Sequence, residues 1–116
     1  MSSGRFGAYD LTANTAQSLA QGTTDRYLAC SISLCNRNNR PVKVGIAITE
    51  TVNAISNLEY IDKDVELLPS TVLERTGIAI KQGQYITVIA DGARISASAW
   101  GVAAGDPVSV TPIPTA

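Results

Sequence analysis

The stretch YLACSISLCNRNNRPVKVGIAIT, Tyr27 to Thr49, decides the fold class, because it holds two alternating segments joined by a polar pentapeptide. Apolar residues occupy every second position: Leu28, Cys30, Ile32 and Leu34 in the first segment, and Val42, Val44, Ile46 and Ile48 in the second. This period of two, with β-branched residues on the apolar side, predicts two half-buried strands.

The pentapeptide NRNNR, residues 36–40, admits two interpretations. Asparagine tolerates left-handed backbone angles and bonds nearby backbone groups, and Pro41 lacks an amide donor and therefore suits the start of a strand. These features predict a hairpin between the two strands. Alternatively, Arg37 and Arg40 read a ligand.

Further strands are predicted at 60–66, 72–80, 84–90 and 94–101, with turns at 81–83 and 91–93. In the last of these strands, Ile95, Ala97 and Ala99 share one face, and Ser96, Ser98 and Trp100 share the other. Trp100 is expected in the core or at an interface. Residues 12–21 are compatible with a helix, but an extended conformation is preferred. Short strands separated by turns predict an all-β fold, an antiparallel sandwich of immunoglobulin-like or jelly-roll-like type.

The chain divides into three parts. Residues 1–24 are predicted to form an N-terminal arm with a first edge strand, residues 25–102 the sandwich core, and residues 103–116 a C-terminal arm. The last part contains Pro107, Pro112 and Pro114. Proline disfavours helix and central strand, so this arm is expected to be extended and to bind other chains.

Composition excludes several functions. The chain has 116 residues, which suits one domain, and its net charge is −1, with 9 basic and 10 acidic residues. This balance argues against nucleic acid and anionic membrane as partners. Aromatic residues make up only 5%, which weakens a base-stacking or sugar-binding surface. The sequence also lacks a secretory signal pattern and an apolar run long enough to span a bilayer.

Catalytic signals are weak. The chain has no histidine, so the usual general base near neutral pH is missing. Glu74 beside Arg75 is interpreted as a surface or interface ion pair, with a catalytic pair as the alternative. Asp62, Asp64 and Glu66 alternate, which would place them on one face of a charged edge strand or, alternatively, a Ca²⁺ site. The sequence therefore predicts a non-enzymatic protein without a cofactor.

The two cysteines, Cys30 and Cys35, are predicted to be free thiols. On one extended strand at ~3.3 Å per residue they lie about 16 Å apart. A disulfide needs Cα atoms within about 7 Å. The alternative is an intermolecular bond at Cys35.

Several segments resemble a module of small virion proteins of tailed bacteriophages. They are SISLCNRNNRPVKVGIAIT, EYIDKDVELLPSTVLERTGIAIKQGQYITVIA and ISASAWG. The module has a strand ending in CNR or TNR, a VKVxIAI strand, a VLERTGI segment and a closing aromatic–Gly pair. The resemblance covers residues 25–102 and implies a β-sandwich that joins or decorates parts of a virion, as a tail-fibre, collar or baseplate module or a capsid cement protein.

The resemblance also implies partners and a location. It predicts a homo-oligomer that contacts other virion proteins, made in the host bacterial cytoplasm and incorporated in the virion. The candidate interface residues are Arg37, Arg40, Glu74, Arg75, Pro107, Pro112 and Pro114. The alternative is a module that binds a host-surface glycan or protein.

Overall fold

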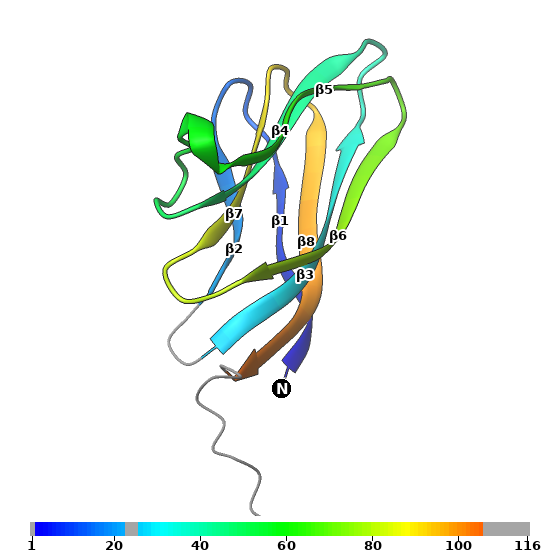
Figure 1. The fold of residues 1–116 in the computed structure, drawn as a ribbon. Coiled ribbons are helices and arrows are strands. Elements are labelled where there is room, and N and C mark those ends of the chain that lie inside the picture. The colour runs from blue at the N-terminus through cyan, green and yellow to red at the C-terminus, as the bar shows by residue number, and fades with distance from the viewer. Residues whose placement is uncertain (1, 23–25, 106–116) are drawn as a thin grey trace, which may run out of the picture.

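The computed structural model describes residues 2–22 and 26–105, which form strands and one short 3₁₀-helix (Figure 1). The elements are β1 (Ser2–Asp10), β2 (Gln17–Gln21), β3 (Arg26–Asn36), β4 (Val42–Thr49), η1 (Asn57–Glu59), β5 (Tyr60–Leu67), β6 (Val72–Ile80), β7 (Tyr85–Ala90) and β8 (Ile95–Gly105). Within these ranges, no helix has the length and apolar character needed to cross a bilayer.

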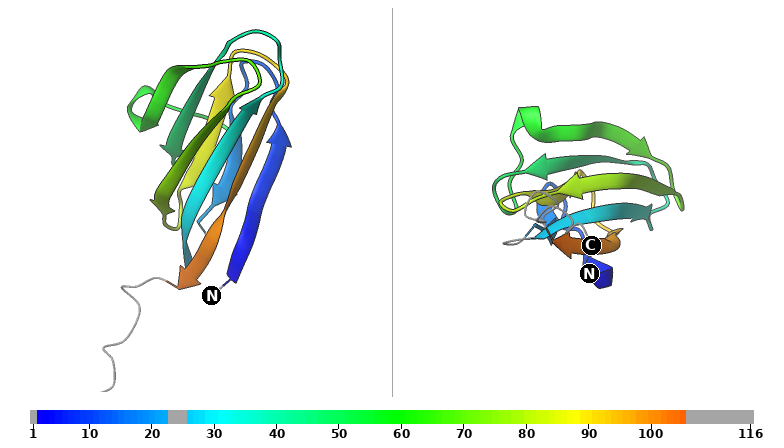
Figure 2. Two further views of the ribbon diagram at one scale, coloured as in Figure 1. Left: turned by 90° about the vertical axis from the view of Figure 1, so that its right-hand side faces the viewer. Right: turned by 60° about the horizontal axis from the view of Figure 1, so that its bottom comes forward.

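The strands form two four-stranded antiparallel sheets that pack face to face (Figures 1 and 2). One sheet has the order β1-β8-β3-β6 and the other β2-β7-β4-β5. The predicted all-β antiparallel sandwich is therefore confirmed. Pairing the first strand with the eighth, the second with the seventh, the third with the sixth and the fourth with the fifth is the arrangement of a jelly roll.

The core lies between the sheets and follows the predicted alternation. In β3, Leu28, Cys30, Ile32 and Leu34 are at most 5% exposed. Val42, Val44 and Ile46 of β4 and Ile86 and Val88 of β7 face them and are also buried. Ile48 is only half-buried.

The predicted hairpin at residues 36–40 is wrong. β3 and β4 lie in different sheets, so the segment crosses from one layer to the other. Asn36 is fully buried at this crossing, and its Nδ2 donates to the carbonyls of Arg40 and Leu67, each at 2.9 Å. Its backbone also bonds Ser70 and Thr71. The asparagine thus joins two neighbouring loops. These hydrogen bonds also satisfy its buried carboxamide.

The N-terminal segment is part of the sandwich. β1 pairs with β8, with Arg5 opposite Trp100, and Leu11 and Leu19 belong to the core. The core therefore begins well before residue 25, where the sequence had placed it. The preference for an extended conformation over 12–21 is confirmed at 17–21 by β2, whereas residues 13 and 14 form a turn.

At the other end, β8 continues past the predicted boundary to Gly105. Pro107, Pro112 and Pro114 lie outside the described residues.

The connection between β4 and β5 covers the outer face of the β2-β7-β4-β5 sheet. Thr87 points to this face, yet it is fully buried. Its Oγ1 lies 2.9 Å from Oγ1 of Thr49 and 2.8 Å from Oγ of Ser18. The Thr49 hydroxyl donates to the carbonyl of Thr51 in the connection. This chain of hydroxyls satisfies the polar groups that the connection shields from water.

Candidate functional site

The sandwich has two open sides, each bordered by one edge strand from each sheet. β5 and β6 border one side, and β1 and β2 border the other. An edge strand carries unpaired backbone groups and is therefore a natural place for contacts with another chain.

An ion pair joins the two sheets on the β5–β6 side. The Arg75 guanidinium donates from Nε to Oδ2 of Asp62 at 2.5 Å and from Nη2 to Oδ1 at 2.7 Å. The hydrogen bond and charge of Asp62 raise the pKa of Arg75. The predicted pairing of Arg75 with Glu74 is therefore not formed. Glu74 is exposed on the outer face opposite Ser33.

The acidic residues of β5 do not share a face, contrary to the sequence prediction. The register shifts between β4 and β5, and Asp64 has a positive φ of 54°. This bulge changes the phase of the strand. Asp62 consequently lies opposite Ile46, which faces the core, whereas Glu66 lies opposite Lys43, which is exposed. In the described part of the chain, no group of three acidic or cysteine side chains could hold a metal ion.

The two loop arginines lie at one end of the sandwich. Arg37 donates from Nη2 to Oδ1 of Asp10 and so ties the β3–β4 loop to the end of β1. Arg40 is exposed. The pair lies apart from Glu74 and Arg75 on β6, so the structure does not bring the four predicted interface residues together.

Two bulges bring β1 and β2 together on the opposite side. The register shifts between Arg5 and Gly7 in β1, and between Ser18 and Ala20 in β2. The extra residues are Phe6 and Leu19, which both pack against the core. A Cβ placed on Gly7 would lie 2.3 Å from the carbonyl oxygen of Leu19. Only a glycine therefore permits this close approach of the two backbones.

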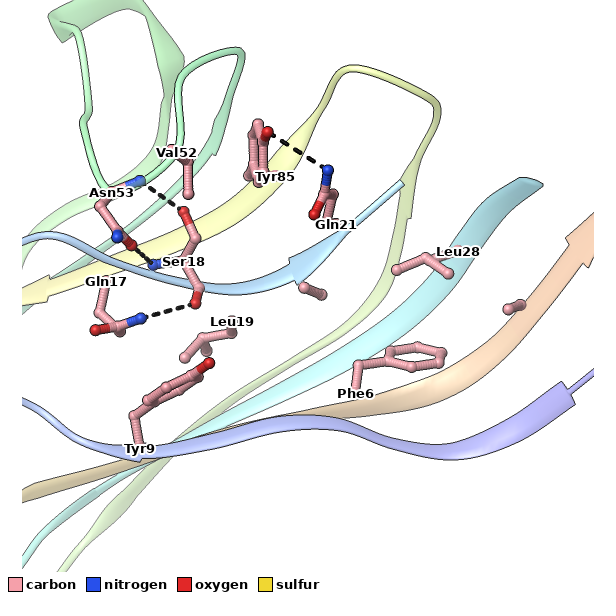
Figure 3. A pocket seen from close by; sticks show the side chains of 12 residues that line it. Phe6, Tyr9, Gln17, Ser18, Leu19, Gln21, Leu28, Val52, Asn53 and Tyr85 are labelled. Atoms are coloured by element: carbon pink, nitrogen blue, oxygen red, sulfur yellow. Dashed lines mark hydrogen bonds between the residues drawn. The ribbon is translucent and has the colours of Figure 1, made fainter. Parts of the chain in front are cut away.

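A groove of about 570 Å³ runs along this side between β1 and β2 (Figure 3). We call it the β1–β2 groove. Its lining residues are Phe6, Tyr9, Gln17, Ser18, Leu19, Ala20, Gln21, Leu28, Val52, Asn53, Tyr85 and Ala103, none of which is charged. The chain has one Phe, four Tyr and one Trp, and three of these six aromatic residues line the groove. Its volume lies in the range of about 300 to 1,000 Å³ that is typical of ligand sites.

Hydrogen bonds hold the wall of the groove formed by β2. The backbone N–H of Ser18 donates to Oδ1 of Asn53 at 2.8 Å, and the Asn53 N–H donates to Oγ of Ser18 at 2.9 Å. Asn53 therefore covers part of the outer edge of β2, as Figure 3 shows. On the facing wall, Tyr9 is 44% exposed, and its ring extends into the groove.

These groups suit binding rather than proton transfer. The lining offers aromatic faces and the carboxamides of Gln17, Gln21 and Asn53, and a carboxamide donates and accepts hydrogen bonds without gaining or losing a proton. Both cysteines are free, as predicted. Burial raises the pKa of the Cys30 thiol to about 11, so this thiol stays protonated at neutral pH and is a poor nucleophile.

Comparisons of the chain with protein-family models, with curated proteins and with solved structures gave no match.

The sequence pattern did not predict the groove, because its residues come from β1, β2, β3, β7, β8 and the β4–β5 connection. The one available signal was Phe6 and Tyr9 near the start of a chain that has few aromatic residues.

Proposed function

We propose that this protein is a non-enzymatic structural component of a bacteriophage virion, where it joins or stabilises neighbouring subunits. It acts through its sheet edges and arms, and its partners are other virion proteins and further copies of itself. The jelly roll supports the proposal by analogy, since viral capsid proteins use this fold, although lectins use it too.

The observation that carries the proposal is the outer face of the β1-β8-β3-β6 sheet. Trp100 lies on this face and is half-buried, with Arg5 on one side of it and Ser31 on the other. One step along β8, Ser98 lies between Ala8 and Ser33. A tryptophan with small residues beside it, here Ser31 and Ser98, is a favourable centre for a protein interface, because a partner can approach closely and enclose the ring.

The borders of this sheet add a second contact mode. β1 and β6 each pair with only one neighbouring strand in the described chain, so each has an edge with unpaired backbone groups. An extended segment of another chain can add to such an edge through main-chain hydrogen bonds. The outer face and its two edges together offer a surface for assembly.

An arginine at the centre of the face tests this proposal. We expect Ser98→Arg to leave the fold intact and to abolish both self-association and incorporation into particles of the phage that encodes the chain. The matched control is Glu66→Arg, an exposed change on the other sheet, which should behave as the wild type. Normal incorporation of Ser98→Arg would contradict the use of this face.

The loop arginines provide a separate test. Reversal of charge at both Arg37 and Arg40 should preserve the isolated fold, since both side chains are exposed. If this end of the sandwich docks on a neighbour, the double variant will be absent from particles, as quantified by mass spectrometry of purified virions.

The alternative function is recognition of a host-surface glycan, and the β1–β2 groove favours it. An exposed tyrosine ring beside carboxamides can stack on a sugar and bond its hydroxyls. Titration of the protein with neutral oligosaccharides, followed by calorimetry, tests this alternative. Saturable binding that Tyr9→Ala abolishes would support it, and absence of heat across a glycan panel would exclude it for that panel.

A further inference from the structure

We propose that the β1–β2 groove is the docking site for the proline-rich segment 106–116 of a neighbouring copy. The inference rests on the proposed assembly function and names the contact that joins one copy to the next. Three features of the chain support it: the point at which the segment begins, its chemistry and the direction in which β8 ends.

The segment begins beside the groove. Ala103 of β8 lines the groove, and β8 ends at Gly105, two residues later. Figure 1 shows the end of β8 next to the start of β1. Residues 106–116, at ~3.3 Å each, could extend about 36 Å. β1 has nine residues and, on the same basis, a length of about 30 Å, so the segment is long enough to follow the groove.

The segment and the groove are chemically complementary. After Asp106 the sequence is PVSVTPIPTA, which has no charged side chain, and the groove has none either. Proline-rich segments bind grooves lined by aromatic rings, because their extended backbone is preformed and loses little entropy on binding. Phe6, Tyr9 and Tyr85 supply such rings, and the carboxamides of Gln17 and Gln21 can bond the carbonyls of an extended chain.

The direction of β8 favours docking on another copy. Pro107 biases the preceding residue, Asp106, toward an extended conformation. An immediate reversal, which the chain would need in order to enter its own groove, is therefore disfavoured. A second copy placed beyond the end of β8 can receive the segment without that reversal. Exchange of segments in this way builds assemblies without any rearrangement of the two sheets.

Sedimentation velocity of the full chain over a range of concentrations tests the inference. We compare the wild type with Tyr9→Ala in the groove, Ile113→Asp in the segment, and the control Tyr60→Ala on β5. The two test variants should each weaken self-association about tenfold or more, as loss of a central contact does. Tyr60→Ala should associate as the wild type, because Tyr60 lies on the opposite side of the sandwich.

A mixture of the two test variants gives the sharper result. Tyr9→Ala retains an intact segment and Ile113→Asp retains an intact groove, so an equimolar mixture should form a 1:1 complex that neither variant forms alone. If Tyr9→Ala fails to fold by circular dichroism, Gln21→Arg places a charge in the groove at an exposed position and replaces it.

Other outcomes overturn the inference and separate it from the proposed function. If both variants associate as the wild type while Ser98→Arg does not, the groove is not the contact but the assembly function stands. A wild-type chain that stays monomeric overturns docking between copies, and its absence from particles would then overturn the function too. Binding of an oligosaccharide in the groove that Ile113→Asp leaves unchanged would assign the groove to a glycan.

Discussion

The two open sides of the sandwich solve the same geometric problem differently. On the β5–β6 side, the Arg75–Asp62 pair spans the gap and closes it with charge. On the β1–β2 side, the bulged residues Phe6 and Leu19 fill the gap from within, while Tyr9 and Tyr85 border an uncharged groove. The first side is closed by a pair of its own side chains, and the second leaves an uncharged groove open. We propose that copies of the chain contact one another on the second side.

The largest expected difference between the two sides is the loss of stability when a glycine on each side, Gly7 or Gly77, is replaced by alanine. Gly7→Ala forces a carbon against the Leu19 carbonyl, which belongs to the backbone and cannot move aside cheaply. We expect a loss of about 3 kcal/mol in the free energy of unfolding, measured by urea denaturation. Gly77 on β6 has φ of +74° and open space around it, so Gly77→Ala should cost only about 1 kcal/mol. Equal losses at the two positions would contradict the close contact between β1 and β2.

Removal of the Asn53 side chain should have an intermediate effect, confined to the groove side. Asn53→Ala deletes the acceptor for the Ser18 N–H and keeps only one of the two hydrogen bonds between Asn53 and Ser18. We expect a loss of about 1 kcal/mol. Asn57→Ala, an exposed change in η1 of the same connection, is the control and should have little effect. The newly freed edge of β2 should also increase aggregation on heating, followed by light scattering.

The charged side should respond to salt. Asp62→Asn removes the ionic partner of Arg75 and should lower stability slightly in dilute buffer. In 1 M salt the difference from the wild type should shrink in part, because salt screens the Arg75 side chain, which is 48% exposed, more than the Asp62 side chain, which is 12% exposed. The same comparison made with Asn53→Ala should show no such dependence on salt. A salt-dependent loss at Asn53 would blur the distinction between the two sides.

The last and smallest expected effect is a difference in the rate of thiol modification between the two faces of β3. Cys30 points into the core and Cys35 lies on the outer face, half-buried. A thiol-specific reagent at neutral pH should modify Cys35 in the folded protein, whereas Cys30 should react only as fast as the chain unfolds. Peptide mapping after a short exposure distinguishes the two sites. Equal labelling would mean that the strand alternation in this sheet is misassigned.

Alternation predicted the strands well, because a half-buried strand must place apolar residues at every second position. Every second residue from Leu28 to Leu34, and every second residue from Val42 to Ile46, is buried as predicted. It could not predict the partners of those strands. The turn residues at 36–40 serve a crossing between sheets as readily as a hairpin, and the crossing depends on Asn36 bonding the distant Leu67 carbonyl.

The site was less predictable than the strands. The bulge at Asp64 turns Asp62 toward Arg75, and nothing in the alternation of DKDVE signals that change of phase. The groove joins residues as far apart as Phe6 and Tyr85, so it exists only once β1, β2 and β7 have come together. Local pattern predicts faces of strands, whereas sites between sheets depend on topology.

Hydrogen–deuterium exchange of the full chain, measured by mass spectrometry across a concentration series, tests the central claim most directly. If copies join through the β1–β2 side, amides in β1 and β2 should gain protection as the concentration rises, while those in β5 should exchange at a constant rate. Greater protection in β5 than in β1 and β2, or no change in β1 and β2 over the range in which the chain associates, would contradict the account.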